Sequence, residues 1–399
     1  MKLLYITSSL PIGTQETFII PEISALLSAG HDITVIPLHP RGDFIHDDAR
    51  PLLPRSVITP LFSPRLLAGI PFLLRHPTAS LRAFKALFTC DPVHLAKNLA
   101  AFFKALYLAK TFDLRSFDHI HAHWSAVSSS LALALHHLSG VSWSFTAHRW
   151  DLVDNNLLIR KIASASFVRL ISHNSLDLVR MHVAAPPMEK IHFIPMGVNI
   201  PPQTISTFSA ADRPFTLLCP ANLLPVKGHS YLIEAIRLLK ERTVSVRLII
   251  AGCGPLEKDL RRLTTAAALN DRVEFAGRIP HGKLLALYRE QAVDTVVLPS
   301  VDLGGGVHEG IPVALIEAMA CGIPVLSTAT GGIPELLGDG AGIMVPDKDP
   351  AALAEAMERL ATDLSLRRLT AEKGRRTVSE RFAMIPVAAR LAALFEAHR

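Results

Sequence analysis

The sequence predicts an α/β protein built from two doubly wound domains, each with a parallel sheet. Short apolar strand-like segments alternate with helical segments along the chain, and the alternation restarts after residues 197–214, which are rich in Pro, Ser and Thr. The 399 residues suffice for two domains, each with its own core. An apolar fraction of 49% with 19% charged residues is typical of a globular chain.

The first half begins with a strand, a helix and a second strand, the unit from which parallel sheets are built. Gly13 lies in the turn after the first strand. Pro21 either begins the following helix or kinks it, and Gly30 ends that helix. We expect strands at 3–7, 33–38, 119–124, 143–146, 167–172 and 191–195, and helices up to about 29 and at 128–138.

His148 follows the expected strand 143–146 and is itself followed by loop residues 149–151. Ligands of open parallel sheets bind at the carboxyl ends of strands, so His148 is a candidate site residue. A histidine at a strand end can equally be an ordinary surface or core residue.

The second half repeats the alternation. Lys227 lies in a glycine-containing loop after a strand, where it could pair with a phosphate or simply be a solvated lysine. We expect strands at 216–220, 246–251, 273–276, 295–298 and 343–345, and helices at 230–240, 350 to about 375, and 383–397.

The stretch from His308 to Glu335 contains two acidic residues, Glu309 and Glu317, eight positions apart. Pro312 suits the first helical position, which predicts a helix at 313–321, a stop at Gly322 and a strand at 323–327. The free N–H groups at the start of such a helix suit an anion such as a diphosphate. Alternatively, both glutamates complement the helix dipole at a solvated face.

Several classes of site are poorly supported. The four cysteines, Cys90, Cys219, Cys253 and Cys321, show no CxxC spacing, which argues against a disulfide framework or thiolate metal site and favours a reducing compartment. No GxGxxG between strand and helix, P-loop, GxSxG or HExxH motif occurs. The Asp347-x-Asp349 pair is better explained by capping of the helix at Pro350, so we expect no metal.

The segment from Arg50 to Lys110 is strongly basic. It carries nine basic residues and one acidic residue, a net of +8 against +6 for the whole chain, with bulky apolar residues interleaved. This mixture suits the surface of an anionic membrane, or an ordinary solvated helix pair with a basic outer face. No recognition module for nucleic acid is present, and no apolar run is long enough for a membrane span. The N-terminus reads as a strand rather than a signal peptide, so we expect a cytoplasmic protein.

The motifs together resemble a known family. EGIPVALIEAMACGIPV followed by GGIPE is similar to the signature of retaining glycosyltransferases of family four. Earlier parts of the chain contain further motifs in the family's order: AGHDITVI, HAHW, IPMGVN, KGH, GCGP, FAGR and VVLPS. QETFI and SFTAHRWDL further resemble members that build exopolysaccharides such as colanic acid. The resemblance implies the GT-B fold, two Rossmann-like doubly wound domains facing a cleft. We expect an acceptor-side domain at 1–198, onto which a C-terminal helix of about 380–399 packs back, and a nucleotide-sugar domain at 199–379.

The resemblance also implies roles for individual residues. Glu309 would contact the transferred sugar where charge develops, and Glu317 would hold the ribose hydroxyls of the donor. Lys227 would neutralise the diphosphate. The further implied contacts are the backbone of Gly310, Ile311 and Val313 at the helix start, Gly13 near the phosphates, and His148 near the reacting sugar.

The sequence departs from the family ahead of the lysine loop. Ala221-Asn222 stands where many members carry Gly-Arg, so an arginine fork onto the diphosphate is missing. Asn222 offers only a neutral amide, and Arg278 or another basic group would have to substitute.

The implied activity is transfer of a sugar, with retention, from a nucleoside-diphosphate-sugar to a glycan or polyprenyl-linked acceptor in cell-surface polysaccharide synthesis. We expect no cofactor or metal, no nucleic-acid partner, and a peripheral location at the inner face of the cell membrane. Two alternatives stay open: a sugar-nucleotide epimerase on the same scaffold, and a catalytically silent scaffold protein.

Overall fold

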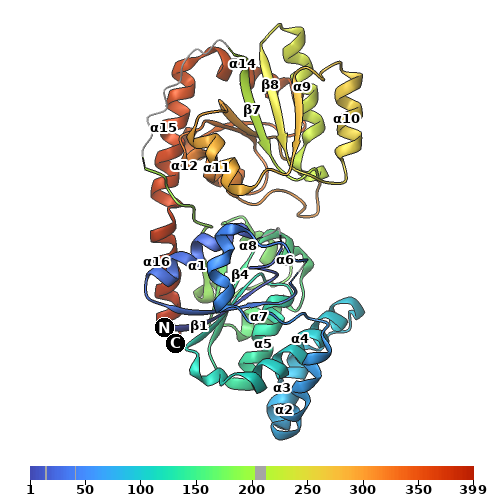
Figure 1. Cartoon of the computed structure of the whole chain (residues 1–399), viewed down its shortest axis with the longest axis vertical. Coiled ribbons are helices and arrows are strands. Elements are labelled where there is room, and N and C mark those ends of the chain that lie inside the picture. Colours follow the sequence, from blue (N-terminus) through green and yellow to red (C-terminus); the bar gives the residue numbers. More distant parts are fainter. Residues whose placement is uncertain (14–15, 41, 203–212) are drawn as a thin grey trace. The chain divides into compact units, whose positions relative to one another are not determined.

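The computed structural model describes residues 1–13, 16–40, 42–202 and 213–399, and it divides into two compact units (Figure 1). Unit 1 comprises residues 1–197 and 384–399, and unit 2 comprises residues 198–383. Gln15 of the QETFI motif and residues 203–212 of the expected linker lie outside the described residues. Each unit contains one six-stranded sheet in which every strand pair is parallel. The predicted α/β class with two doubly wound sheets is therefore confirmed.

The sheet of unit 1 has the strand order β2-β1-β3-β4-β5-β6. Pro21 lies in the first turn of α1 and begins that helix, where its missing N–H does no harm. The strands are β1 Lys2–Thr7, β2 Asp32–Pro37, β3 His119–His123, β4 Trp143–Ala147, β5 Phe167–Leu170 and β6 Ile191–Phe193. The helices that cover the sheet include η1 Thr17–Ile19, α1 Ile20–Ser28, η4 Leu114–Ser116, α5 Val127–Ser139, α6 Arg149–Asp154, α7 Leu158–Ser164, α8 Ser175–Arg180 and α16 Met384–Ala397.

One expectation for unit 1 was wrong. Residues 149–151 form the first turn of α6 and not a loop. The Asp151 carboxylate accepts the backbone N–H of His148, the residue that caps this helix, and so stabilises its first turn.

A helical lobe extends from unit 1 between β2 and β3, and α2, α3 and α4 lie together in it (Figure 1). Its elements are η2 Asp47–Arg55, η3 Pro64–Gly69, α2 Ile70–Arg75, α3 Pro77–Leu87 and α4 Pro92–Thr111. Lys104 of α4, counted among the basic surface residues of this segment, is instead fully buried. Its ammonium group donates to the carbonyls of Pro37, Leu38 and Thr59, which ties α4 to the end of β2, and burial lowers its pKa to about 7.

The C-terminal helix α16 packs on the other side of unit 1, against α1 and the first strands (Figure 1). Its buried residues Leu391 and Phe395 share a core cluster with Leu3 and Tyr5 of β1 and Phe167 of β5. Residues nearly 400 positions apart in the chain thus form one apolar core.

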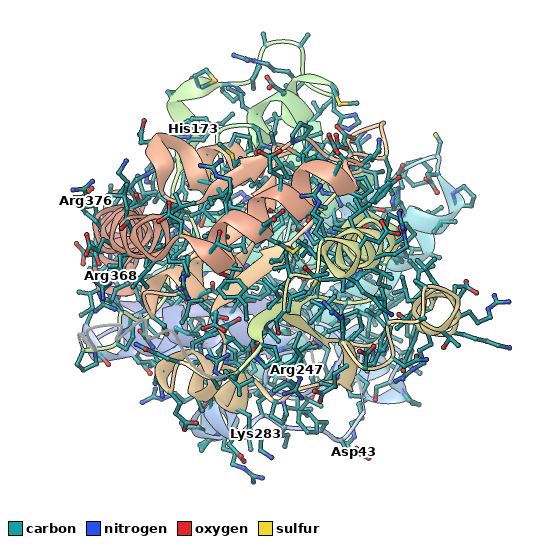
Figure 2. All side chains as sticks on the ribbon, turned by 90° about the horizontal axis from the view of Figure 1, so that it is seen from above. Asp43, His173, Arg247, Lys283, Arg368 and Arg376 are labelled. Carbon is teal, nitrogen blue, oxygen red and sulfur yellow. The ribbon has the colours of Figure 1, made fainter. Side chains whose placement is uncertain are left out.

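The sheet of unit 2 has the order β12-β11-β10-β7-β8-β9. Its strands are β7 Phe215–Pro220, β8 Val246–Ala251, β9 Val273–Gly277, β10 Thr295–Leu298, β11 Val325–Thr328 and β12 Ile343–Val345. Its helices are η6 Pro225–Lys227, α9 His229–Glu241, α10 Glu257–Ala266, α11 His281–Arg289, α12 Val313–Ala320, α13 Ile333–Leu337, η7 Gly338–Gly340, α14 Pro350–Thr362 and α15 Leu364–Arg381. Arg247, Lys283, Arg368 and Arg376 of this unit, which are labelled in Figure 2, are exposed.

The helical run expected from 350 to about 375 is two helices, because Asp363 interrupts it. This residue has φ −105° and ψ 98°, and its carboxylate accepts the Leu366 N–H and so begins α15. Asp349 caps α14 in the same manner by accepting the Ala352 N–H, which confirms that the Asp-x-Asp pair leads into a helix cap.

Candidate functional site

The candidate residues divide between the units: Gly13 and His148 belong to unit 1, and the other eight belong to unit 2. Within each unit the strands are parallel, so the loops that follow them meet at one edge of the sheet. In unit 2, β7 and β10 are neighbours, and this adjacency places the loop of Lys227 beside the loop of Glu309.

Lys227 and Glu309 form an ion pair, although they are 82 positions apart. The Glu309 carboxylate also accepts from Ser300 Oγ at 3.3 Å. The side chains of Lys227 and Glu309 are only 19% and 16% exposed, so solvent screens this pair less than it screens a surface pair. A cation and a carboxylate are therefore held together at the carboxyl edge of the sheet.

Two glycines allow the loops at this edge to approach closely. Gly228 has φ +67°, and a Cβ there would lie 1.8 Å from the carbonyl oxygen of Pro299. Gly331 has φ +54°, and a Cβ there would lie 1.9 Å from the carbonyl oxygen of Glu309. Only glycine fits at either position, and so the loop after β11 supports the backbone of Glu309 directly.

The start of α12 is open toward an anion. Pro312 is the N-cap residue rather than the first helical residue as expected, and it has no side chain that could cap the helix. Within the described ranges, the backbone N–H groups of Val313 and Ala314 have no hydrogen-bond acceptor. A Cβ added at Gly310 would meet no atom within 4 Å. Free N–H groups next to open space are the features of an anion site at a helix start.

Glu317 lies one turn further along α12 and pairs with a histidine that the sequence analysis missed. His281 Nε2, at the start of α11, lies 2.7 Å from the Glu317 carboxylate. No sequence motif singled out His281, because it lies 36 residues away and meets Glu317 only through the packing of α11 on α12. Besides its contact with His281, the Glu317 carboxylate has further lone pairs that can accept hydrogen bonds.

Asn222 and Arg278 are both exposed and lie at separate positions on the edge. Asn222 follows β7, whereas Arg278 follows β9, and β8 lies between these strands. Arg278 therefore follows a strand that lies two places along the sheet from the strand that precedes Asn222.

In unit 1, His148 lies at the carboxyl end of β4 within an aromatic cluster. Its Nε2 atom lies 2.8 Å from His123 Nε2 at the end of β3. The ring centroid of Trp124 is 4.3 Å from that of His148, and the ring centroid of Phe18 is 5.7 Å away. Desolvation by the surrounding protein, with the nearby Arg169 charge, lowers the pKa of His148 to about 3, so the imidazole is neutral at physiological pH.

Asp151 is a second residue that sequence reasoning missed. Its carboxylate accepts the backbone N–H groups of Ser125 and His148, and so joins the loop after β3 to the end of β4. Burial raises the pKa of Asp151 to about 7. Lys161 Nζ donates to the carbonyls of Ser125 and Ala126 at 2.7 and 2.6 Å, and thereby holds the same loop from the other side.

Gly13 lies in the loop after β1, with φ +115° and its N–H donating to the Phe44 carbonyl at 2.8 Å. Buried Glu16 organises this loop. Its carboxylate accepts the backbone N–H groups of Ser8, Ser9 and Leu10 and the indole N–H of Trp124. Glu16 therefore connects the loop of Gly13 to the aromatic cluster around His148.

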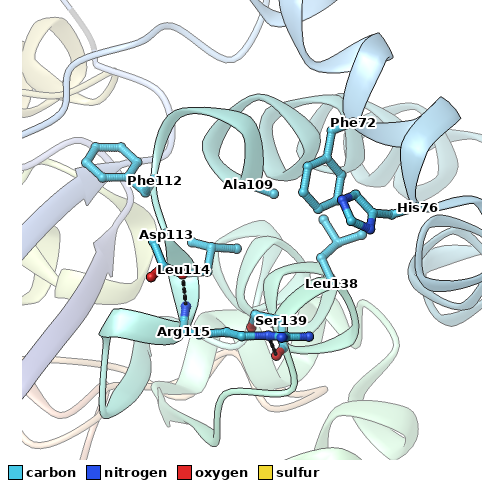
Figure 3. Close-up of a pocket in the computed structure, with 9 residues that line it drawn as sticks. All are labelled: Phe72, His76, Ala109, Phe112, Asp113, Leu114, Arg115, Leu138 and Ser139. Atoms are coloured by element: carbon cyan, nitrogen blue, oxygen red, sulfur yellow. Dashed lines mark hydrogen bonds between the residues drawn. The ribbon is translucent and has the colours of Figure 1, made fainter.

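A cavity of about 290 Å³ lies elsewhere in unit 1 and contains none of the candidate residues (Figure 3). Its lining includes η4, which precedes β3, and the end of α5, which precedes β4, so it lies at the amino-terminal edge of the sheet. The lining residues are Phe72, His76, Ala109, Phe112, Asp113, Leu114, Arg115, Leu138 and Ser139.

Comparison with known proteins relates part of the chain to one family. Residues 204–377 match the family described as glycosyl transferases group 1. The amylovoran biosynthesis glycosyltransferase AmsK of Erwinia amylovora is 28% identical over 389 residues, 90% of this chain and 91% of AmsK. WcaL of Escherichia coli K12, named as a colanic acid biosynthesis glycosyltransferase, is 42% identical over 188 residues, 46% of each chain. The match to WcaL thus spans less than half of that relative's length.

The fold is shared with solved structures. The crystal structure of Anabaena Alr3699/HepE in complex with UDP-glucose matches with a TM-score of 0.70 and 16% identity, and the match covers 100% of both chains. At this identity the likeness establishes the fold.

Proposed function

We propose, from the premise that residues 204–377 form a domain of the glycosyl transferases group 1 family, that this chain is a retaining glycosyltransferase. It would move a sugar from a nucleoside-diphosphate-sugar to a glycan or polyprenyl-linked acceptor in cell-surface polysaccharide synthesis. AmsK and WcaL are named as glycosyltransferases of amylovoran and colanic acid biosynthesis, which supports the polysaccharide product. The observation that carries this proposal is the Lys227–Glu309 pair beside the uncapped start of α12. We assign donor binding to unit 2 and the acceptor to unit 1.

The donor diphosphate must be stabilised by positive charge, because its own negative charge increases as the sugar leaves. The N–H groups at the start of α12 would bind its oxygens, and the Lys227 ammonium would exchange part of its contact with Glu309 for the phosphate. Glu309 would then face the sugar, whose anomeric carbon becomes cationic, as a preformed negative charge. Glu317, fixed by His281, would accept hydrogen bonds from the ribose hydroxyls.

Retention would follow from a front-face reaction in which the departing diphosphate takes the acceptor proton. Glycosidases use two flanking carboxylates for such chemistry, whereas here Glu309 is already paired with a lysine and Glu317 with a histidine. Because side chains and backbone N–H groups would meet the diphosphate charge, we expect transfer to continue in the presence of a chelator.

The test uses the purified full chain. A thermal-shift panel of UDP-, GDP- and ADP-sugars should first identify the donor, because a ligand that binds the folded state raises its stability. With that donor, Glu309→Gln and Lys227→Met should each lower transfer at least about a hundredfold while the variants remain folded. Lys283→Met, at an exposed lysine of the same unit, is the matched control. Near wild-type transfer by both site variants would refute the assignment.

The same assay separates the two alternatives. An epimerase would convert the sugar nucleotide without any acceptor, so product analysis in the absence of acceptor would reveal it. A silent scaffold would show no stabilisation by any nucleoside-diphosphate-sugar in the panel.

We further propose that the helical lobe of unit 1 binds an anionic membrane surface. Of the twenty large apolar residues that are exposed among those described, nine lie between residues 62 and 103, and Phe62 and Leu74 are 72% and 71% exposed. Within the described ranges, no helix is long and apolar enough to cross a bilayer, so the contact would be interfacial. The nine residues are Phe62, Leu67, Ile70, Leu74, Leu81, Phe84, Phe88, Val93 and Phe103.

The spacing of these residues supports one apolar face. Leu81 and Phe84 are three residues apart in α3, so they share a side of that helix. The ring of Phe88, the residue that follows α3, lies 6.4 Å from the ring of Phe84. Exposed Arg82 and Lys85 lie next to them in the sequence and would contact anionic headgroups.

Co-sedimentation with vesicles tests the membrane proposal. Binding should require phosphatidylglycerol, fall with added salt, and fall several-fold in a Leu81→Gln/Phe84→Gln variant. A Leu263→Gln/Leu369→Gln variant alters two exposed leucines of unit 2 and is the matched control. Equal binding to neutral vesicles, or no effect of the lobe variant, would refute this part.

A further inference from the structure

A chain of fully buried polar side chains crosses unit 1 and ends at His148, which is partly buried. It begins at Arg169 of β5, whose guanidinium donates to the carbonyls of Ile194 and Pro195 and to Glu22 Oε2 at 2.6 Å. The other oxygen of Glu22 accepts from the Tyr5 hydroxyl at 2.7 Å. All of Arg169, Glu22 and Tyr5 are 0% exposed, so water cannot substitute for any of these contacts.

The hydrogen bonds of this chain permit only one arrangement of protons. The single hydroxyl proton of Tyr5 is donated to Glu22, so the Tyr5 oxygen can only accept from His123 Nδ1, which lies 3.1 Å away. His123 must then carry its proton on Nδ1 and present a lone pair at Nε2. His148 Nε2, 2.8 Å from His123 Nε2, must therefore be the donor of that bond.

We propose that Tyr5 and His123 are positioning residues that hold His148 in the tautomer protonated at Nε2, which leaves Nδ1 as its only hydrogen-bond acceptor. The proposal rests on the proposed function only in taking His148 as a residue near the reacting sugar. The only N–H of the His148 ring is then directed at His123, so in that place the ring would have no N–H to donate to a substrate hydroxyl.

Independent features of unit 1 agree with this arrangement. In the capping box at the start of α6, the His148 side chain accepts the Asp151 backbone N–H, which requires a lone pair on the nitrogen that faces away from His123. Burial holds the pKa of His123 well below its usual range, so both rings of the pair are neutral and a single proton lies between them. The Trp124 ring, tilted by 33° to the His148 ring at 4.3 Å, fixes the plane of the imidazole.

The opposite tautomer would break the chain. If His148 carried its proton on Nδ1, two lone pairs would face each other at 2.8 Å unless His123 also changed tautomer. His123 would then present a lone pair to the Tyr5 oxygen, whose only proton already binds Glu22. Glu22 forms an ion pair with Arg169 through one carboxylate oxygen and accepts from Tyr5 through the other, so it acts as an acceptor in both contacts.

Nuclear magnetic resonance of the histidine ring nitrogens tests the proposal directly. In full-length protein with ¹⁵N-labelled histidine, the His148 signal is assigned by its loss in His148→Gln. We expect the Nε2-protonated pattern in the wild type. In Tyr5→Phe, the ratio of the Nε2-protonated to the Nδ1-protonated tautomer of His148 should fall about tenfold, the usual effect of one lost hydrogen bond. Thr146→Val removes the 3.0 Å bond to buried His121 in the same core and should leave His148 unchanged.

Protonation of wild-type His148 at Nδ1 would overturn the proposal, and so would a tautomer ratio in Tyr5→Phe equal to that of the wild type. The wild-type spectrum decides the first point even if Tyr5→Phe does not fold. With a known donor, Tyr5→Phe should also lower kcat about tenfold at unchanged donor KM, whereas Thr146→Val should not. If His148→Gln transfers sugar normally, the role of His148 in the proposed function fails, while the spectra still decide the tautomer.

Discussion

Replacing Gly331 by alanine tests how the loop after β11 supports Glu309. The added Cβ would lie 1.9 Å from the Glu309 carbonyl oxygen and 2.5 Å from His308 Nδ1. Gly331 also has φ +54°, a conformation that disfavours residues with a side chain by about 1–2 kcal/mol. The backbone displacement required by the contact adds about 1–3 kcal/mol. We therefore expect the free energy of unfolding to fall by about 2–5 kcal/mol.

Gly310→Ala is the matched substitution next to Glu309, in the loop before α12. A Cβ at Gly310 would meet no atom within 4 Å, so we expect stability to stay within about 0.5 kcal/mol of the wild type. Its methyl group would instead occupy the space in front of α12, where we propose that the diphosphate binds. The donor KM should therefore rise severalfold in Gly310→Ala.

Urea denaturation and donor saturation kinetics measure the two effects separately. The expected pattern is a large loss of stability for Gly331→Ala, and a higher donor KM without loss of stability for Gly310→Ala. Wild-type stability of Gly331→Ala would contradict the close packing of the two loops. Wild-type donor affinity of Gly310→Ala would contradict a donor site at the start of α12.

Three further predictions concern stability and the second glutamate. Burial lowers the pKa of His119 to about 4 and that of His148 to about 3, so the unfolded chain binds protons below pH 6.5 that the native protein does not bind. Urea denaturation should therefore show about 2 kcal/mol less stability per histidine at pH 5 than at pH 7. Equal denaturation midpoints at the two pH values would contradict this. Lys104→Met should lower the free energy of unfolding by about 2–4 kcal/mol because three buried carbonyls lose their donor, and an unchanged denaturation midpoint would count against that role. His281→Ala should raise the donor KM severalfold because Glu317 loses the partner that orients it, whereas a change in kcat alone would indicate another role.

The resemblance to glycosyltransferases, drawn from the EGIPVALIEAMACGIPV and GGIPE motifs, is confirmed by the family match over residues 204–377. Most strand positions were also predictable, because fully buried parallel strands are short continuous apolar runs that differ from their surroundings. The strand β3 does not fit this pattern, since His119, His121 and His123 are buried in it. The helix that begins at Arg149 was missed because its stabilising group, the Asp151 carboxylate, acts on the backbone and leaves no periodic apolar pattern.

Lys104 shows a related limit of sequence reasoning. A lysine among basic and apolar residues is indistinguishable in sequence from a surface lysine, and only the three carbonyls around its ammonium group make it an interior residue. The buried chain from Arg169 to His148 was equally invisible, since its members come from α1, β1, β3, β5 and the position that follows β4.

Local composition was thus enough to identify the alternation of strands and helices, the residue types at the ends of β4, β7 and β10, and the resemblance to the family that residues 204–377 match. It contained no information on which strand ends would be neighbours. The sheet order β11-β10-β7 brings Gly331, Glu309 and Lys227 together at the carboxyl edge of the unit 2 sheet. The order β1-β3-β4 joins Tyr5 through His123 to His148. The physical reason is that spacing along the chain reports local conformation, whereas ion pairs and proton order depend on contacts that form only when distant strands pair.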